Sequence, residues 1–130
     1  MRVLFVCKHN AGRSQISEAF FNHFTIKHTA TSAGTHPPPE PLPEFVLRCM
    51  NEKGIDMSKH SRKPLTQELF NQADKVIMLT SKEDWPAYAL TSSKVEYWEV
   101  EGGKGQSYEF ICLMRDKLEL LILDLIKRLP

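Results

Sequence analysis

Short β-favouring apolar segments alternate with segments of helical periodicity along the chain, and this alternation restricts the fold more than any other feature. Strict alternation of this kind predicts βαβ units, a mostly parallel sheet and right-handed crossovers. The expected strands cover residues 3–6, 29–33, 76–79 and 95–98. We therefore predict an α/β fold, a single doubly wound domain over residues 1–130 in which helices flank a four-stranded parallel sheet on both faces.

Helical segments are expected at residues 13–27 and 43–53, with short helices after Thr66 and Ser81 and a long one after Ser107. Thr66 is placed to cap the short helix that ends near Gln72, and Gly54 stops the helix before it. In the last helix a stripe of apolar residues recurs at helical spacing and predicts a core-facing surface: Ile111, Met114, Leu118, Leu121, Ile122, Leu125 and Leu129. A chain of 130 residues is long enough to bury such a core without disulfides or a metal.

The charge balance excludes a general attraction to polyanions. Lysine and arginine number 17 against 16 acidic residues, so the net charge is +1. Nucleic acid and membrane surfaces are therefore not expected as partners. The apolar stretch near the C-terminus is interrupted by Glu119 and Asp124, which also argues against a membrane span. The sequence does not indicate an oligomeric state.

The three cysteines, Cys7, Cys49 and Cys112, are odd in number and far apart, which is a poor disulfide framework. This usage fits a reducing compartment, so we expect a cytoplasmic protein. The histidines have no metal-ligand spacing, and we expect no metal and no cofactor.

Residues 7–14, CKHNAGRS, come directly after the first predicted strand and lead into the first helix. Parallel sheets bind ligands at the carboxyl ends of their strands. A loop that curls between a strand and a helix N-terminus turns its N–H groups toward one centre and binds an anion there. The predicted oxyanion-binding residues are Lys8, His9, Asn10, Ala11, Gly12 and Arg13.

Cys7 is the candidate nucleophile of this loop, because the helix N-terminus and Arg13 both favour its thiolate form. The guanidinium of Arg13 can hold two oxygens of a tetrahedral oxyanion at once. Ser14 can donate its hydroxyl to the sulfur, Asn10 can tie the loop to itself, and His9 can add positive charge. The alternative is that Cys7 is a small core residue and Arg13 a surface residue, but their spacing between strand and helix favours the catalytic interpretation.

These residues, in FVCKHNAGRSQISEAFF, resemble the opening of the low-molecular-weight protein tyrosine phosphatases and the related thioredoxin-coupled arsenate reductases. The segments SAGTHP, KGID, KPLT, ADKVIML and WEV…KGQS follow in the family's order and spacing. The resemblance implies a four-stranded parallel sheet with flanking helices. It also implies Cys7 as nucleophile, Arg13 as oxyanion clamp, Ser14 as thiolate partner, and loop-positioning hydrogen bonds from Asn10 and Ser32.

The chain departs from the family's pattern at the proton donor. Family phosphatases carry an Asp-Pro pair on a late loop, where the Asp protonates the leaving oxygen, and this position holds Gly102-Gly103 here. The neighbouring Glu101 is a candidate substitute, although an exposed loop glutamate without a role is an equal alternative. Glu83 and Asp84 are weaker candidates, because both suit the first turn of a helix.

The arsenate reductases of this type relay a disulfide to cysteines on the loop after the third strand, and residues 80–86 contain none. Cys49 is on the apolar face of its helix and is better explained as a core residue, whereas Cys112 is off the apolar stripe of the last helix. The usual relay therefore cannot run in this chain. Gly12 stands where many family phosphatases have a second loop cysteine, so a protective disulfide of Cys7 within the loop is excluded as well.

The leading hypothesis is a cysteine-dependent hydrolase of phosphomonoesters, of the protein tyrosine phosphate type, that forms a phosphocysteine on Cys7. The first alternative is an arsenate reductase that uses an external small thiol, and the second is a non-catalytic module that binds oxyanions or phosphoproteins. The expected ligands are phosphate, arsenate or a similar oxyanion, and a phosphorylated protein or small aryl phosphate. Three aromatic residues near the sheet end, Trp85, Tyr88 and Trp98, are candidates for the wall of a substrate pocket, although such residues are more typical of a core. A basic run, Lys59, Arg62 and Lys63, is predicted to be a solvated face.

Overall fold

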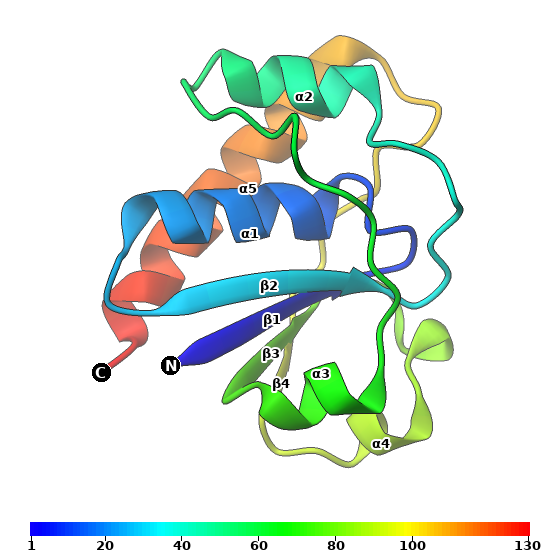
Figure 1. The fold of residues 1–130 in the computed structure, drawn as a ribbon, viewed down its shortest axis with the longest axis vertical. Helices are drawn as coiled ribbons and strands as arrows, with labels where there is room; N and C mark the ends of the chain where they lie inside the picture. The colour runs from blue at the N-terminus through cyan, green and yellow to red at the C-terminus, as the bar shows by residue number, and fades with distance from the viewer.

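The computed structural model describes all residues, 1–130, as one α/β unit (Figure 1). The strands are β1 (Arg2–Cys7), β2 (Thr29–Gly34), β3 (Lys75–Met78) and β4 (Val95–Tyr97). The helices are α1 (Arg13–Phe24), α2 (Glu44–Asn51), α3 (Gln67–Gln72), α4 (Ala87–Leu90) and α5 (Tyr108–Arg128), with a 3-10 turn, η1, at Lys82–Asp84. The strand order is β2-β1-β3-β4 and every neighbouring pair is parallel, which confirms the predicted sheet.

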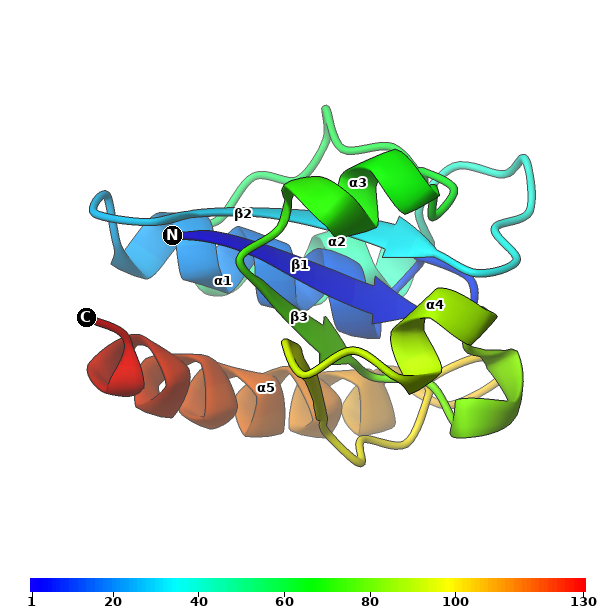
Figure 2. The same ribbon diagram turned by 90° about the horizontal axis from the view of Figure 1, so that it is seen from below.

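Strand β1 lies inside the sheet, between β2 and β3. Its residues from Val3 to Cys7 are all buried, as the continuous apolar run predicted. Since all four strands point the same way, their carboxyl ends meet at one edge of the sheet, and both chain termini lie at the opposite end (Figures 1 and 2). The loop after β1 therefore opens at the edge where parallel sheets bind ligands.

Helices cover both faces of the sheet (Figure 2). Helices α1, α2 and α5 pack on one face, where Phe5 and Ile77 belong to the larger buried cluster together with Phe20, Met50 and Leu118. Helices α3 and α4 cover the other face over a smaller cluster that includes Leu4, Val6, Phe70, Val76 and Ala89. Successive residues of β1 point alternately into the two clusters. Both faces of this strand are therefore buried, which is why its sequence is apolar throughout.

Side-chain caps define two of the predicted helix starts. The Thr66 hydroxyl accepts a hydrogen bond from the Leu69 N–H at 3.1 Å, and the Ser107 hydroxyl accepts one from the Phe110 N–H at 3.1 Å. Ser81 makes no such cap, and only the 3-10 turn η1 follows it. Helix α1 ends at Phe24, three residues earlier than predicted, because Thr25 adopts an extended conformation before the turn into β2.

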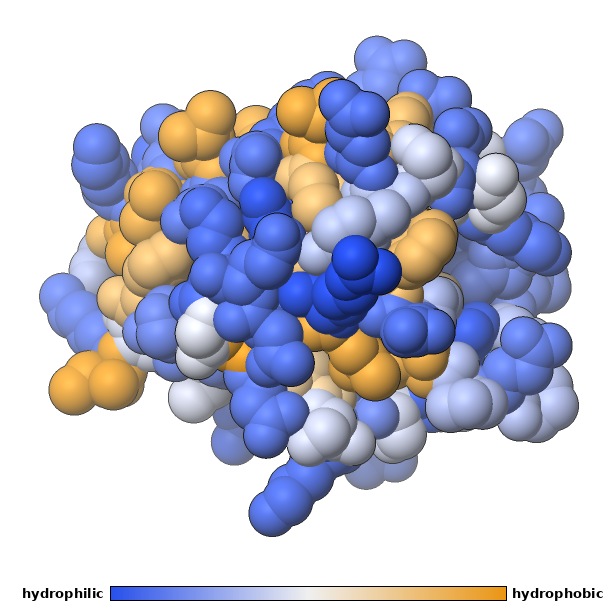
Figure 3. All heavy atoms as spheres, turned by 90° about the horizontal axis from the view of Figure 1, so that it is seen from above, coloured by the Kyte–Doolittle hydropathy of each residue, from blue (hydrophilic) through white to orange (hydrophobic).

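The core-facing stripe of α5 is confirmed, with Leu118, Ile122 and Leu125 fully buried. Arg115 is also buried on this helix, because its guanidinium donates to the Cys49 carbonyl at 2.8 Å and pairs with Glu52 at 3.2 Å. No helix combines the length and the apolar character needed to cross a membrane. On the face seen from above, apolar residues form small separate groups among hydrophilic ones (Figure 3).

Candidate active site

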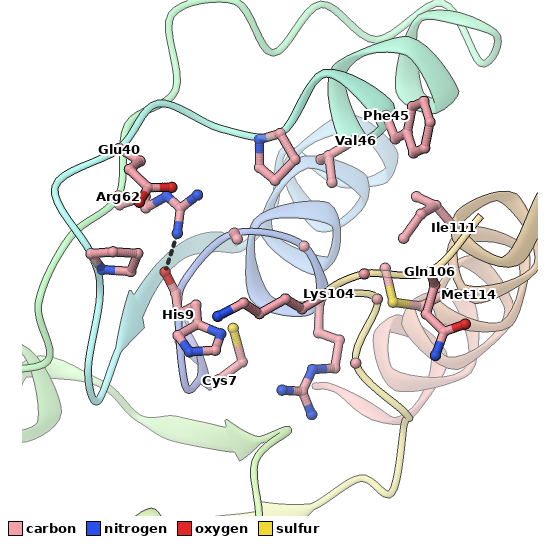
Figure 4. Close-up of a pocket in the computed structure, with 18 of the residues that line it drawn as sticks. Cys7, His9, Glu40, Phe45, Val46, Arg62, Lys104, Gln106, Ile111 and Met114 are labelled. Carbon is pink, nitrogen blue, oxygen red and sulfur yellow. Dashed lines mark hydrogen bonds between the residues drawn. The ribbon is translucent and has the colours of Figure 1, made fainter. Parts of the chain in front are cut away.

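The loop of residues 8–12 joins β1 to α1 at the carboxyl edge of the sheet and encloses the Cys7 sulfur (Figure 4). Backbone hydrogen bonds from the chain after β2 hold this loop: the Thr35 N–H donates to the Cys7 carbonyl at 3.0 Å and the His36 N–H donates to the Lys8 carbonyl at 2.8 Å. A Cβ atom on Gly34 would lie 2.9 Å from the Lys8 carbonyl oxygen, so this close approach requires glycine.

Ser14 Oγ lies 2.8 Å from Cys7 Sγ, and both side chains are buried. The Asn10 side-chain amide donates to the same Oγ at 2.7 Å. With this lone pair of Ser14 occupied, the hydroxyl proton is free to point at the sulfur. The arrangement stabilises a thiolate on Cys7, because a hydrogen bond to a charged acceptor is stronger than one between neutral groups.

Asn10 is the support of the loop. It is fully buried and has a positive φ of 50°, a conformation that asparagine tolerates better than most residues. Its amide nitrogen also donates to Ser32 Oγ at 3.1 Å, and its Oδ1 atom accepts from Gln15 Nε2 at 2.9 Å and from the Lys63 N–H at 2.8 Å. The side chain thus connects β2, α1 and the segment before α3.

Arg13 is held at the mouth of the loop by backbone carbonyl groups. Its Nη1 atom donates to the Leu79 carbonyl, and to the Val100 carbonyl at 3.1 Å. These carbonyls follow β3 and β4, so the guanidinium spans the carboxyl edge of the sheet. A Cβ atom on Gly102 would lie 3.2 Å from Arg13 Nη2, so Gly102 packs directly against the guanidinium.

Cys7 lies in a cavity of about 850 Å³ whose lining is cationic on one side and apolar on the other (Figure 4). The cationic side includes Arg13, Arg62 and Lys104, with the His9 ring among them. Lys104 extends from the loop after β4 toward His9 and Cys7. The apolar side is built by α2 and α5 and includes Phe45, Val46, Ile111 and Met114. Such a cavity suits a tetrahedral oxyanion that carries a less polar group.

Two glutamates, Glu40 and Glu44, are the acidic residues of the lining. Arg62 is fixed between two loops, because Nη1 donates to the His9 carbonyl at 3.4 Å and Nη2 to the Pro41 carbonyl at 3.1 Å.

His9 is the titratable group of the loop with a displaced pKa. Partial burial lowers the pKa of its imidazole below the ordinary value, and the positive charges of Lys104, Lys8, Arg62 and Arg13 lower it further. The ring makes no hydrogen bond within the chain, so it is available to a ligand. At neutral pH the free protein therefore presents an uncharged imidazole beside Cys7.

The structure brings together the predicted set Cys7, Asn10, Arg13, Ser14 and Ser32. It places Glu101 elsewhere: this residue is exposed and does not line the cavity. Glu83 and Asp84 form η1 instead, where they accept hydrogen bonds from Ser81 and Thr80. Lys8 is exposed outside the lining, so its contribution to an anion site is its backbone N–H and its charge.

The aromatic candidates do not wall the cavity. Trp98 is buried against Phe5 in the core, Tyr88 packs on Phe70 under the opposite face of the sheet, and Trp85 packs on Tyr97. The other cysteines are also outside the lining. Cys49 is buried, which raises the pKa of its thiol to about 12, and Cys112 lies 3.8 Å from the Glu52 carboxylate.

Two site residues were missed as such from the sequence. Arg62 was assigned to a solvated basic face, and Lys104 was noted only as part of the KGQS segment, yet both line the cavity. The signal for Lys104 was present, since it lies within the glycine cluster that replaces the Asp-Pro pair. No group of three or more His, Cys, Asp or Glu side chains is arranged to hold a metal ion.

Comparison with known proteins gives both phosphatases and arsenate reductases. The family model for low molecular weight phosphotyrosine protein phosphatase matches residues 2–100. The glutaredoxin arsenate reductase of Synechocystis sp. is 30% identical over 135 residues, covering 98% of each chain. Among solved structures, the low molecular weight protein tyrosine phosphatase from T. tengcongensis has a TM-score of 0.87 and 29% identity, covering 99% of each chain. An arsenate reductase in the phosphate binding state has a TM-score of 0.87 and 29% identity, covering 99% of this chain and 98% of its own.

Proposed function

The chain belongs to the low molecular weight phosphotyrosine protein phosphatase family, and within it we propose that this protein hydrolyses phosphomonoesters through a phosphocysteine on Cys7. The observation that carries the proposal is the Ser14 hydroxyl 2.8 Å from the Cys7 sulfur, at the wall of a cavity rich in cations. The proposed substrates are phosphotyrosine-type phosphoproteins or small aryl phosphates, and the proposed setting is the cytoplasm.

In the first step the Cys7 thiolate attacks phosphorus while the bond from phosphorus to the ester oxygen breaks, and the oxygen leaves with a proton. The loop N–H groups and the Arg13 guanidinium hold the three non-bridging oxygens, and this stabilises the charge of the transition state. In the second step water attacks phosphorus, the bond between sulfur and phosphorus breaks, and phosphate and the Cys7 thiolate are released. Ser14 stabilises the sulfur as nucleophile and again as leaving group.

A second candidate function is arsenate reduction with an external small thiol. It is favoured by the arsenate reductases among the relatives and by Gly102-Gly103, which stands where the family's phosphatases carry the Asp-Pro pair. In that reaction Cys7 displaces hydroxide from arsenate, and a small thiol then attacks the Cys7 sulfur. The sulfurs become a mixed disulfide, and arsenic takes two electrons and leaves as arsenite. Neither Cys49 nor Cys112 lines the cavity, so the second thiol must come from outside the chain.

The test compares turnover of 4-nitrophenyl phosphate, turnover of phosphotyrosine, and arsenate reduction by a small thiol. Cys7→Ser should abolish ester hydrolysis while phosphate still binds, and Arg13→Lys should weaken both because the bidentate fork is lost. Cys112→Ser is the matched control, since this thiol is outside the cavity. Arsenate reduction without ester hydrolysis would favour the second function, and phosphate binding without either reaction would favour a binding module.

A further inference from the structure

The proposed hydrolysis requires a proton donor for the leaving oxygen, and none of the predicted carboxylates is in place. Glu101 is exposed and outside the lining, and Glu83 and Asp84 are held in η1. From the geometry of the loop we propose that His9 is this proton donor. The inference rests on the proposed phosphatase function and names the group that completes it.

His9 has the position that the role requires. It is two residues from Cys7 on the anion-binding loop, lines the same cavity, and presents its ring beside the Cys7 sulfur in Figure 4. Its backbone is anchored, because the His9 carbonyl accepts a hydrogen bond from Arg62 at 3.4 Å, while its ring nitrogens have no partner in the chain. The other histidine of the lining, His36, is exposed and its Nδ1 atom is 3.0 Å from the Thr35 hydroxyl.

The charges around the ring explain how His9 would receive its proton. Titratable and charged groups around it come from several elements: Cys7 from the end of β1, Lys8 from its own loop, Arg13 from α1, His36 and Glu40 from the loop after β2, Glu44 from α2, Arg62 from the segment before α3, and Lys104 from the loop after β4. In the free protein burial is the largest cause of the lowered pKa of His9, and the neighbouring cations lower this pKa further. A phosphomonoester dianion places negative charge among these cations and favours the imidazolium.

Binding of substrate thus brings a proton from solvent onto His9. As the Cys7 sulfur bonds to phosphorus, the imidazolium proton passes to the departing ester oxygen, and the alcohol or phenol leaves neutral. The neutral imidazole then takes a proton from the water that attacks the phosphocysteine, and the thiolate is released with phosphate. Lys104 is a positioning residue in this scheme, because it acts on the pKa of His9.

The experiment measures kcat/KM for two esters, 4-nitrophenyl phosphate and phenyl phosphate, in wild type and His9→Gln. Nitrophenolate leaves readily without a proton, whereas phenolate does not. We expect His9→Gln to lose about 100-fold or more with phenyl phosphate and less than about 10-fold with 4-nitrophenyl phosphate. His23→Gln is the matched control, since His23 is exposed on α1 and outside the cavity, and it should leave the ratio of the two esters unchanged.

A pH profile separates proton transfer from a structural role. The kcat for phenyl phosphate should fall as pH rises through the pKa of His9 in the complex with substrate. This alkaline limb should be absent in His9→Gln. Lys104→Met should move the limb to higher pH, because Lys104 lowers the pKa of His9.

Equal losses with both esters, or an unchanged alkaline limb in His9→Gln, would overturn the assignment of His9 while the phosphatase function stands. Absence of Cys7-dependent hydrolysis of 4-nitrophenyl phosphate in wild type would overturn the proposed function and this inference with it. Retained phosphate binding by His9→Gln shows that the variant is folded.

Discussion

The hydroxyl of Ser14 lies 2.8 Å from the sulfur of Cys7, and the Asn10 amide donates to the same hydroxyl oxygen at 2.7 Å. Because Asn10 donates its proton to this oxygen, the Ser14 proton has the sulfur as its acceptor. The proposed nucleophile at the end of β1 and its supporting donor in the first turn of α1 are therefore held together across the loop between them.

Ser14→Ala should reduce kcat/KM for 4-nitrophenyl phosphate by roughly 10- to 100-fold, the value of one hydrogen bond to a charged group. The rate of alkylation of Cys7 by iodoacetamide at neutral pH should fall as well, because the sulfur loses the hydrogen bond from Ser14. Ser17→Ala is the matched control, because the Ser17 hydroxyl donates to the Arg13 carbonyl at 2.7 Å and does not touch Cys7. Equal effects of the two variants would contradict the direct role of Ser14.

Asn10→Ala should destabilise the protein by about 3–5 kcal/mol and remove activity. The buried partners of its side chain would lose their hydrogen bonds, and alanine is less tolerant of the positive φ at this position. Urea unfolding of the variant measures the loss. Asn22→Ala is the control, because the Asn22 side chain both donates to the Ala30 carbonyl and accepts from the Ala30 N–H but is exposed. Its loss should destabilise the protein by only about 1 kcal/mol. A similar loss in both variants would show that burial of the Asn10 network contributes little.

Much of the fold was predictable, because it depends on local patterns. The four strands, the parallel sheet and the caps of Thr66 and Ser107 follow from apolar runs, alternation and side-chain chemistry. The core of the site was predictable for the same reason, since the residues from Cys7 to Ser14 are contiguous between a strand and a helix.

Arg62 could not be predicted as a site residue, because long-range packing places it. Arg62 reaches the cavity only through its hydrogen bonds to the His9 and Pro41 carbonyls, which no local pattern indicates. Glu101 was a candidate because of its position next to Gly102, yet the path of the loop leaves it exposed and outside the lining. Adjacency in the sequence therefore did not predict which loop residues line the cavity.

The stability of the protein should depend on Glu96 above about pH 2. Partial burial alone would raise the pKa of this carboxyl, but hydrogen bonds from Arg128, Trp98 and Lys75 lower it to about 2. Since the folded-state pKa is below the ordinary value of 4.5, the stabilisation is complete above that value and is lost as pH falls toward 2. Glu96→Gln should therefore cost about 1–2 kcal/mol at pH 7, after screening by solvent, and almost nothing at pH 2.

Urea unfolding of wild type and Glu96→Gln at several pH values measures this difference. Glu99→Gln is the matched control, because the Glu99 side chain is exposed and makes no hydrogen bond or ion pair in the chain. If Glu96→Gln cost the same at pH 7 and pH 2, the effect would come from packing and not from charge.

Gly103 and Ile111 are predicted to be coupled. A Cβ atom on Gly103 would overlap Ile111 Cδ1, so Gly103→Ala should destabilise the protein by about 1–3 kcal/mol through overpacking. Valine lacks the Cδ1 atom, so Ile111→Val should relieve the clash even though it costs about 0.5–1.5 kcal/mol by itself. The double variant should then be more stable than the sum of the single losses by about 1 kcal/mol, as measured by urea unfolding. Additive losses would mean that the Ile111 side chain does not contact the loop at Gly103.

The same clash should affect substrate binding, because Lys104 follows Gly103 directly. Gly103→Ala should raise KM for 4-nitrophenyl phosphate by displacing Lys104, and adding Ile111→Val should restore part of the affinity.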